Sequence, residues 1–434
     1  MIAFAAWVSF LRRYATRPLC TFLTPPMARR VVLALLVALA LPALAHGQDA
    51  PFSRMDVFDL EWVANPQVSP DGSQIVYQRR GMDVMEDRRT SALWRLDADG
   101  TDHTKLTPRT AVESSPRWSP DGSKIAFTSS DEEHGTEIYV HWVEQNKTAR
   151  ITQLENAPSG LSWSPDGAHL AFSMHVSAPE PTLASRPEPP EGADWAEPPR
   201  VETRLNHESD GTGVLDYGHD HLFVVRADGG RARQVTAGDY NHSSRPVWTP
   251  DGEALLYSAN RHDNWERERR NSELYRVPVD GGESTPLTDR FGPDHTPRVS
   301  PDGETIAYLG YDDEVQTYQV TRLYVMNRDG SDQRVVDLGL NRSIDDIAWD
   351  EDGEGLYVQY EDEGTTKLGH TTLDGSTSVV ATNLGGTSIG RPYGGGDFSV
   401  SEAGRLAFNQ TSPAHPAELA VTRRGRDTTR QLTD

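Results

Sequence analysis

Apolar and polar positions along this chain repeat in one recognisable combination, a polar turn followed by a short apolar strand. In its full form the combination reads Trp-Ser-Pro-Asp-Gly, then two polar residues, then an apolar run such as Ile125-Ala126-Phe127. Proline presets φ at the second position of a tight turn and glycine accepts the positive φ that closes it, so each copy predicts a turn between two strands. The seven copies occupy residues 68–77, 118–127, 163–172, 248–257, 299–308, 349–358 and 400–408.

The spacing of these turns predicts the fold. The turn glycines lie 50, 45, 85, 51, 50 and 51 residues apart, and a second hairpin pattern follows in most repeats, as in residues 138–152 and 274–288. A period near 50 with about four strands per repeat is typical of a β-propeller. We therefore expect an all-β fold, a seven-bladed β-propeller of four-stranded blades, over residues 64–434. The expected blades are about residues 64–108, 109–153, 154–237, 238–289, 290–339, 340–383 and 384–434.

The phase of the repeat predicts how the ring closes. Blade 1 would begin with its first strand and blade 7 would end with its fourth, so the ring would close by side-chain packing, without a shared strand. Strand directions then place both termini and every connection from a second to a third strand on one face. Three of these connections are long, at residues 78–90, 178–220 and 258–272. Long loops on a rigid scaffold commonly carry function, although the proline-rich 178–220 also suits a solvated spacer.

Tryptophan precedes four of the turns. A large aromatic side chain at a fixed place in the repeat is expected to pack between neighbouring blades, and stacking on a ligand is the alternative. The four residues are Trp118, Trp163, Trp248 and Trp349.

The first 45 residues have the features of a secretory signal peptide. A basic stretch at Met27–Arg30 precedes an apolar run from Val31 to Leu44, and a small-residue cleavage site lies before His46. The apolar run has 14 residues, fewer than the ~20 that span a membrane. We expect residues 1–45 to be removed, with the true start of translation at Met27 as an alternative to Met1. The mature protein would then be periplasmic or secreted, with no membrane attachment after cleavage.

The segment between the expected signal peptide and the ring, residues 46–63, is expected to contain a short capped helix from Ser53 to Val63. The only cysteine of the chain, Cys20, lies in the expected signal peptide. The mature protein would therefore have neither disulfides nor thiol chemistry, which fits a bacterial exported protein stabilised by its core alone.

Charge and motifs exclude several classes of ligand. The net charge of −23 argues against nucleic-acid binding, which needs a basic face. No phosphate-binding glycine loop of the P-loop or dinucleotide-binding type occurs. His219, Asp220 and His221 lack a third metal ligand at a recognisable spacing, and residues 97–104 lack the closing glutamate of a calcium loop. We expect no cofactor and no metal.

Residues 386–390, Gly-Thr-Ser-Ile-Gly, match the G-x-S-x-G pattern around the nucleophile of serine hydrolases. That nucleophile needs a helix directly after it, but the residues that follow include a proline and three consecutive glycines. Only one histidine, His415, follows Ser388. We therefore expect no catalytic residue in this chain, and we assign Ser388 to the connection between blades 6 and 7.

Several phrases of the sequence resemble the propeller of prolyl oligopeptidase family serine peptidases, in particular the bacterial exported acylaminoacyl-peptidase and dipeptidyl-aminopeptidase branch. The resemblance covers about residues 53–434 and is more specific in the loops than in the turns. The phrases are SRMDVFDLEWVANPQVSPDG (53–72), GMDVMEDRR (81–89), SANRHDNWERERRNSELY (258–275), QVTRLYVMNRDG (319–330) and GGTSIGRPYGGGDFSVS (385–401).

The resemblance implies a role in a peptidase. In that family a C-terminal α/β-hydrolase domain in the same chain carries the catalytic triad, and the propeller restricts access to short peptides and contacts the substrate. This chain ends where that domain would begin, so it is expected to lack the domain and to be inactive alone. The resemblance makes Arg261, Asp263, Trp265 and Glu266 candidates for substrate or interdomain contact; the alternative is an exposed charged loop without a binding role.

Two other functions stay open from the sequence. One is a stand-alone periplasmic binding propeller similar to the propeller protein of the Tol system. That protein carries an α/β domain before its ring, for which this chain has no room before residue 64. The other is a propeller glycosidase, which requires a pair of carboxylates at a defined separation in the mouth of the ring.

Overall fold

In the computed structural model, the described residues are 52–433 without 108–110, 186, 197–198, 243, 387–394 and 427. They contain thirty β-strands and one 3-10 helix, η3 (Asp56–Asp59). Phe58–Asp434 forms one compact unit, and the residues up to Val57 form a separate one. None of the helical structure in the described part is long and apolar enough to cross a membrane. The fold is all-β, as expected.

The strands fall into groups of four, and each strand runs antiparallel to the next one in its group. Group 1 holds β1 (Trp62–Val68), β2 (Gln74–Asp83), β3 (Arg88–Asp97) and β4 (Thr104–Lys105). Group 2 holds β5 (Val112–Trp118), β6 (Lys124–Asp131), β7 (Gly135–Trp142) and β8 (Lys147–Arg150). Group 3 holds β9 (Pro158–Trp163), β10 (His169–Ser177), β13 (Gly218–Arg226) and β14 (Arg233–Gln234), with a small hairpin, β11 (Glu208–Ser209) and β12 (Gly213–Val214), between β10 and β13.

The remaining described strands repeat the same order. Group 4 holds β15 (Val247–Trp248), β16 (Ala254–Ala259), β17 (Glu273–Pro278) and β18 (Thr285–Pro286). Group 5 holds β19 (Asp294–Val299), β20 (Thr305–Gly310), β21 (Arg322–Asn327) and β22 (Arg334–Val336). Group 6 holds β23 (Ile344–Trp349), β24 (Gly355–Asp362), β25 (Thr365–Thr372) and β26 (Thr377–Leu384). Group 7 holds β27 (Phe398–Val400), β28 (Arg405–Ser412), β29 (His415–Arg423) and β30 (Arg430–Gln431).

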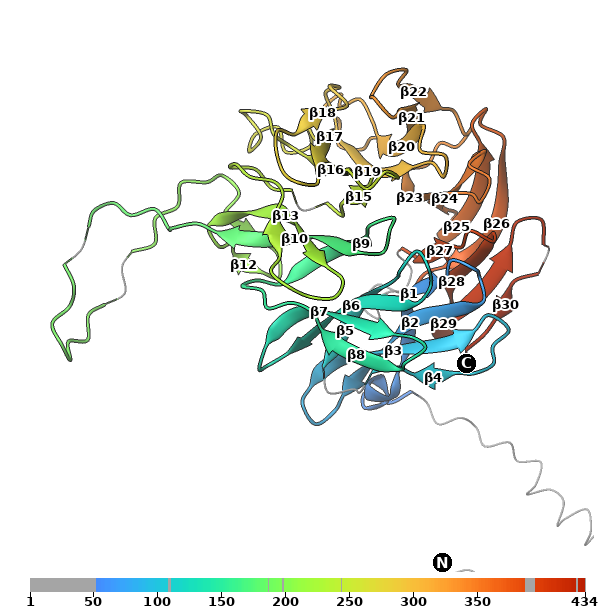
Figure 1. Cartoon of the computed structure of the whole chain (residues 1–434), viewed down its shortest axis with the longest axis horizontal. Coiled ribbons are helices and arrows are strands. Elements are labelled where there is room, and N and C mark those ends of the chain that lie inside the picture. Colours follow the sequence, from blue (N-terminus) through green and yellow to red (C-terminus); the bar gives the residue numbers. More distant parts are fainter. Residues whose placement is uncertain are drawn as a thin grey trace, which may run out of the picture. The chain divides into compact units, whose positions relative to one another are not determined.

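The first strands of neighbouring groups lie beside one another. In the series β1, β5, β9, β15, β19 and β23, each strand contacts the next one. At the other end of the chain, β27 contacts β1. Figure 1 shows the groups following one another around a centre, with the red β27 and β28 next to the blue β1 and β2. The sheets are therefore arranged as in a β-propeller, with the first strand of each group innermost.

One aromatic side chain from the second strand of each group is fully buried. Several of these rings stack on an aromatic residue of the third strand, as Phe127 does on Tyr139 and Tyr257 on Tyr275, with ring centroids 5.7 and 5.5 Å apart. Stacked aromatic pairs on paired strands stabilise a sheet beyond the burial of their area. The seven residues are Tyr77, Phe127, Phe172, Tyr257, Tyr308, Tyr357 and Phe408.

The recurring turn is held by its own side chains. In the first copy the Ser69 hydroxyl donates to Asp71 Oδ1 at 2.6 Å, and the same oxygen accepts the backbone N–H of Ser73 at 3.0 Å. Gly72 has a φ of +74°, and all seven turn glycines have positive φ, which confirms the prediction. The same hydroxyl-to-carboxylate bond recurs as Ser119–Asp121, Ser164–Asp166, Thr249–Asp251 and Ser300–Asp302.

Each turn also touches the turn of the next group. A Cβ atom added to the glycine of one turn would lie against the proline ring of the preceding one, for example 3.7 Å from Pro120 at Gly167 and 3.0 Å from Pro250 at Gly303. The absence of a glycine side chain thus lets proline pack closely. Groups 6 and 7 have Glu351 and Glu402 in place of the turn proline, and the glycine of group 7 faces the Glu351 carboxylate.

The four tryptophans before the turns join neighbouring groups. In all four cases the indole Nε1–H donates to a backbone carbonyl in the first strand of the preceding group. Trp163, Trp248 and Trp349 are also part of the apolar clusters between groups. The expected packing between sheets is confirmed. The bonds are Trp118 to Gln67, Trp163 to Arg117, Trp248 to Ser162 and Trp349 to Arg298, at 2.9 to 3.1 Å.

Group 7 meets group 1 through side chains. Asp397 Oδ2 accepts the backbone N–H of Asn65 at 2.8 Å, and Ser399 Oγ accepts that of Val68 at 2.9 Å. Among the described strands, no β-ladder joins the two groups. An apolar cluster of Val63, Val68, Ile75, Tyr77, Leu96, Ala98, Ala407, Leu419 and Val421 fills the space between them.

The expected helix from Ser53 to Val63 is not confirmed as an α-helix. The Ser53 hydroxyl and N–H both bond to the carboxylate of Asp56, at 2.6 and 2.7 Å, as in a helix cap. The helix that follows is the single 3-10 turn η3, because β1 already begins at Trp62 and pairs with β2.

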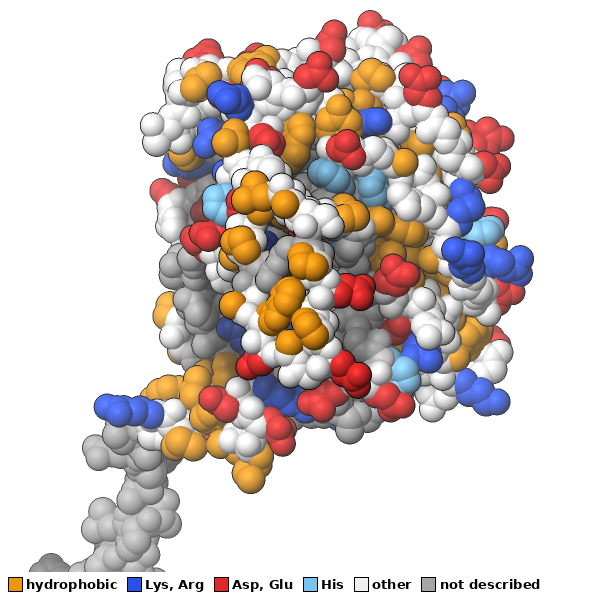
Figure 2. Space-filling view, turned by 90° about the vertical axis from the view of Figure 1, so that its left-hand side faces the viewer, with side chains coloured by type: hydrophobic (Ala, Val, Ile, Leu, Met, Phe, Trp, Pro, Cys, Tyr) orange, Lys and Arg blue, Asp and Glu red, His pale blue; other side chains and the backbone are white. Residues whose placement is uncertain are grey.

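The long insertion of group 3 extends from the β10–β13 pair (Figure 1). Figure 2 faces this side of the molecule and shows apolar side chains at its centre, surrounded by charged ones of both signs. Leu183 and Leu205 of the insertion are 83% and 61% exposed. The insertion therefore adds accessible apolar surface to an otherwise charged side.

Candidate functional site

A cavity of about 720 Å³, here called the central cavity, lies where first strands of the ring meet loops of groups 3 and 4. Thr296 to Arg298 enter it from β19, and Asp345 and Asp346 enter it from β23. The β16–β17 connection covers part of its edge. Its lining residues are Asn206, Asn241, Ser244, Arg245, Ser258, Ala259, Asn260, Trp265, Glu266, Arg269, Ser272, His295, Thr296, Pro297, Arg298, Asp345, Asp346, Gln359 and Gly396.

A bulge in the innermost strands shapes this centre. Asn65, Ser115 and Thr296 have φ values of +50°, +55° and +55°, and each stands directly before a proline. The pairing of the first with the second strand shifts in register at each of these positions. Positive φ is unfavourable for serine and threonine and is found where the surrounding structure imposes it, often at functional sites. The strain therefore marks the centre of the ring.

The bulge also orients the side chain that follows the proline. Arg117 Nη1 donates to the carbonyl of Pro116 at 2.6 Å, and Arg298 Nη1 donates to that of Pro297 at 3.0 Å. In group 1 the same position is Gln67, whose amide donates to the carbonyl of its own preceding proline at 2.9 Å. The repeat thus holds a polar side chain near the centre in three groups.

The guanidinium groups at the centre differ in their partners. Arg298 donates to Asp346 Oδ1 at 2.9 Å and to the carbonyl of Ile347 at 3.0 Å. Arg117 donates to Asn65 Oδ1 at 3.0 Å, and its buried Nε has no partner among the described residues. Arg245 makes no hydrogen bond or ion pair with any described side chain, although it lines the cavity and solvent in the cavity reaches it.

The pKa values of these arginines show that they act on one another. Burial is the main cause that lowers the pKa of Arg117 to about 10, and the charge of Arg298 acts in the same direction. The pKa of Arg245 is lowered mainly by the charge of Arg117, then by burial and by Arg298. Asp346 opposes the shift in both residues. The charges of Arg117 and Arg298 therefore disfavour the cationic form of Arg245.

Two of the residues proposed from the loop phrases, Trp265 and Glu266, line the central cavity. The ring of Trp265 meets that of His219 edge to face, with centroids 6.3 Å apart. Glu266 Oε1 accepts the backbone N–H of Leu205 at 2.9 Å. Both residues therefore connect the β16–β17 connection to group 3 and its insertion at the edge of the cavity.

The other two residues of that loop lie elsewhere. Arg261 does not line the cavity; its guanidinium lies over the rings of Tyr240 and Tyr275, 5.5 and 5.3 Å from their centroids, and donates to the Tyr257 hydroxyl at 3.2 Å. Asp263 is exposed on the loop and is also absent from the cavity lining. The structure brings together only half of the four candidates.

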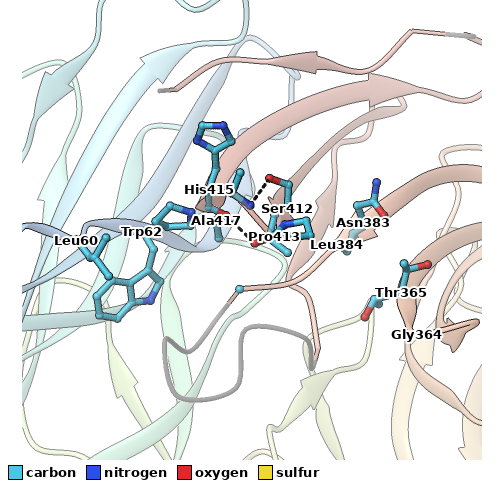
Figure 3. Close-up of a pocket in the computed structure, with 15 residues that line it drawn as sticks. Leu60, Trp62, Gly364, Thr365, Asn383, Leu384, Ser412, Pro413, His415 and Ala417 are labelled. Atoms are coloured by element: carbon cyan, nitrogen blue, oxygen red, sulfur yellow. Dashed lines mark hydrogen bonds between the residues drawn. The ribbon is translucent and has the colours of Figure 1, made fainter. Parts of the chain in front are cut away.

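A second hollow, here called the apolar groove, has a volume of about 440 Å³ and lies between the start of β1 and the hairpins of groups 6 and 7. Figure 3 shows Leu60 and Trp62 on one side of it, the β28–β29 hairpin turn around Pro413 beside them, and Asn383 and Thr365 across the space. Trp62 is only 4% exposed, and its indole N–H has no acceptor among the described residues. The groove therefore offers apolar surface and one unpaired buried donor.

The G-x-S-x-G stretch is not part of the described structure. Ser388 lies in residues 387–394, outside the described residues, so the structure gives no surroundings for it. The histidine that follows it in sequence, His415, lines the apolar groove. Nothing in the described residues pairs this histidine with a carboxylate.

The described part of the chain holds no group of three or more histidine, cysteine, aspartate or glutamate residues suited to a metal ion. Asp220, which lies between His219 and His221 in sequence, bonds instead to His175 Nδ1 at 3.0 Å. Burial lowers the pKa of both His219 and His221, while the charge of Asp239 acts in the opposite direction. These side chains serve the packing of group 3.

The central arginines were not predicted as site residues from the sequence. Their signal was present: the pairs Pro116-Arg117 and Pro297-Arg298 stand immediately before a turn, where group 1 has Pro66-Gln67. The Pro-Arg pair alone does not predict where the arginine side chain points. The bulge in the strand directs it to the centre.

Comparison with known proteins supports the propeller. The PD40 family, described as the TolB beta propeller domain, matches residues 57–182. The chain is 27% identical over 206 residues to "Uncharacterized peptidase YuxL" of Bacillus subtilis, covering 47% of this chain and 30% of that protein. It is 24% identical over 327 residues to "Dipeptidyl-peptidase 5" of Porphyromonas gingivalis, covering 72% and 47%. The chain thus spans less than half the length of these relatives.

Solved structures show the same fold. Pyrococcus horikoshii acylaminoacyl peptidase aligns with a TM-score of 0.64 and 17% identity, over 87% of this chain and 53% of that one. The β-propeller domain of the Trilobed protease from Pyrococcus furiosus, described as having an open velcro topology, aligns with a TM-score of 0.59 and 16% identity, over 86% and 96%. The resemblance of this chain to the propeller portion of prolyl oligopeptidase family peptidases is confirmed.

Proposed function

We propose that this chain is the propeller portion of an exported serine peptidase, in which the ring admits short peptides to a catalytic α/β-hydrolase domain. The names of the relatives support the peptidase class. The observation that carries the proposal is that Trp265 and Glu266, the loop residues expected to meet a substrate, line the central cavity together with Arg245 and Arg298. A cavity of this size, near 720 Å³, falls within the usual range for ligand sites, about 300–1,000 Å³.

The architecture we propose for it is a ring of seven blades over residues 64–434, one for each strand group, with the boundaries expected from the repeat. The contacts of Asn65 with Asp397 and of Val68 with Ser399 support closure by side chains rather than by a shared strand. The apolar groove beside Trp62 is a surface for the hydrolase domain in this proposal. Its unpaired indole donor would then bond to an acceptor of that domain.

Export is a further part of the proposal. Residues 1–45 would direct the chain to the periplasm or the exterior and be removed before His46. Their basic and apolar composition supports this. N-terminal sequencing of the protein recovered from the periplasm tests it, and a protein that begins at or before Met27 would contradict it.

Calorimetric titration of the purified chain with dipeptides to pentapeptides tests the function. We expect binding that weakens about tenfold or more in Trp265→Ala, because the indole forms one wall of the cavity. Asp263→Ala, on the same loop but outside the cavity, is the matched control and should bind as the wild type does. Absence of peptide binding, or equal loss in both variants, would contradict the proposal.

A hydrolysis assay addresses the catalytic part. We expect the purified chain to leave acylaminoacyl and dipeptidyl chromogenic substrates intact. Hydrolysis that disappears in Ser388→Ala would place the catalytic centre in this chain and overturn the proposed division of roles. The DNA after codon 434 gives an independent check, since the proposal expects a hydrolase domain encoded there, in frame or after a frameshift.

A stand-alone binding propeller of the Tol type is the second candidate. The match of residues 57–182 to the TolB beta propeller domain favours it. This function predicts a stable complex with a periplasmic protein and no affinity for short peptides, so the same titration distinguishes the two candidates.

A further inference from the structure

Three arginines interact electrostatically near the centre of a strongly acidic protein. The chain has a net charge of −23, yet Arg245 and Arg298 line the central cavity. The charge of Arg117, from the first strand of group 2, also acts on Arg245. The charges of Arg117 and Arg298 both act on Arg245, and the charge of Arg298 acts on Arg117, where Asp397 and Asp346 oppose it. Like charges in a partly desolvated space are unfavourable unless a counter-charge accompanies them.

The donors of these arginines are not used up. A guanidinium has five N–H donors in a planar fork. Arg298 uses its donors on Asp346 and on two carbonyls, and Arg117 uses only Nη1. Arg245 donates no hydrogen bond to a described residue. Of the three arginines, it alone is exposed to the cavity and has no partner among the described residues.

Three of the nearby carboxylates bond to other groups, and none of them pairs with Arg245. Asp346 Oδ1 accepts from Arg298 and from the backbone N–H of Ile347 at 2.8 Å. Asp397 accepts from Asn65, and Glu266 accepts from Leu205. Asp345 also lines the cavity but forms no ion pair with a described residue. The described structure therefore lacks a carboxylate that pairs with Arg245.

We propose that Arg245, supported by Arg117 and Arg298, binds a carboxylate of a peptide held in the central cavity. A carboxylate matches the fork of a guanidinium in two parallel hydrogen bonds, and it would supply the missing counter-charge. Asp345 and Asp346 line the same cavity and would repel a doubly charged phosphate more strongly than a singly charged carboxylate. The inference rests on the proposed function in that a peptide carries the anion.

The remaining lining suits a peptide rather than a bare anion. Gln359 Oε1 has no hydrogen-bond partner among the described residues and can accept from a peptide backbone, and Trp265 offers an apolar wall. The amides of Asn241 and Asn260 also line the cavity but bond to the protein backbone. The cavity, at about 720 Å³, is far larger than one carboxylate group needs. The carboxylate is either the C-terminus of the peptide or an acidic side chain, which share one chemistry.

Titration of the full chain with paired peptides tests the proposal. An N-acetylated tripeptide of alanines with a free C-terminus is compared with its C-terminal amide, and with an amide that carries one glutamate. We expect the free acid to bind at least tenfold more tightly than the plain amide, with a difference that shrinks as salt is raised. The glutamate amide shows whether a side-chain carboxylate also serves.

The matched variants are Arg245→Gln and Arg328→Gln. Arg328 lies on an exposed turn, outside the cavity, and its substitution should leave all affinities unchanged. Arg245→Gln should abolish the preference for the acid, so that acid and amide bind with equal affinity. Because Arg245 makes no bond within the described structure, the variant should fold, and an unchanged circular dichroism spectrum verifies this.

The outcomes separate this inference from the proposed function. Equal affinity for acid and amide, or a preference that survives Arg245→Gln, overturns the arginine site while the peptide-binding function stands. If neither peptide binds, the proposed function fails, and the carboxylate site fails with it.

Discussion

The indole N–H of Trp163 donates a hydrogen bond to the backbone carbonyl of Arg117, 3.0 Å away in the neighbouring strand group. We expect Trp163→Phe to lower the free energy of unfolding by about 1–3 kcal/mol, since a buried partner is left unpaired and packing area is lost. Urea unfolding followed by circular dichroism measures this. Trp94→Phe is the control, because its indole nitrogen has no partner among the described residues. An equal loss in both variants would assign the effect to packing alone.

The contact between turns should make substitution by alanine cost more stability at one turn glycine than at another. Gly167 and Gly303 both have positive φ, but an added Cβ would lie 3.7 Å from Pro120 at the first and 3.0 Å from Pro250 at the second. We expect Gly167→Ala to cost about 1–2 kcal/mol from backbone strain, and Gly303→Ala to cost more because the proline must move. Differential scanning calorimetry compares the two melting temperatures. If Pro250→Ala fails to reduce the excess cost of Gly303→Ala, the contact is not its cause.

The turn aspartates should make the protein sensitive to acid. The hydrogen bond from Ser119, with those from Ser123, lowers the pKa of Asp121 from 3.8 to about 2. Because the folded pKa lies below the unfolded value, the stabilisation is complete above about pH 4 and is lost as the pH falls toward 2. The stability difference between wild type and Asp121→Asn should therefore shrink over this window. A difference that is constant from pH 7 to pH 2 would contradict the assignment.

Loss of the charge of Arg245 and loss of the charge of Arg298 should have opposite effects on the stability of the protein. Arg245→Gln removes a repelled cation that bonds to no described residue, so we expect an unchanged or raised melting temperature. Arg298→Gln breaks bonds to Asp346 and to the carbonyl of Ile347, and we expect it to cost about 1–3 kcal/mol. Thermal unfolding at low ionic strength makes the contrast largest. Destabilisation by Arg245→Gln would mean that its charge is compensated in the free protein.

The sequence predicted the parts of this fold that depend on local chemistry. Positive φ at Gly72 and its equivalents follows from the turn, and the position of Trp163 between sheets follows from the repeat. The helix near Ser53 was overestimated, because a cap pattern says where a helix can begin but not how soon a strand such as β1 takes over. The tertiary pairing of β1 with β2 decided the outcome.

Only some residues of the candidate site could be predicted from the sequence. The resemblance of the loop phrases made Trp265 and Glu266 candidates, and both line the central cavity. Arg245 was missed because nothing in its surroundings distinguishes it from the many surface arginines of this chain. Its significance comes from Arg117 and Arg298, which are more than fifty residues away in sequence and meet it only through the ring.

The chain of contacts between turns has one more consequence. Pro165 lies against Gly252 as Pro120 lies against Gly167, although the insertion of group 3 separates the first pair and nothing comparable separates the second. The contact between neighbouring turns is thus the same whether the loop at the opposite end of the strands is long or short. The β10–β13 connection can therefore lengthen, shorten or be exchanged while the contacts between the turns stay the same.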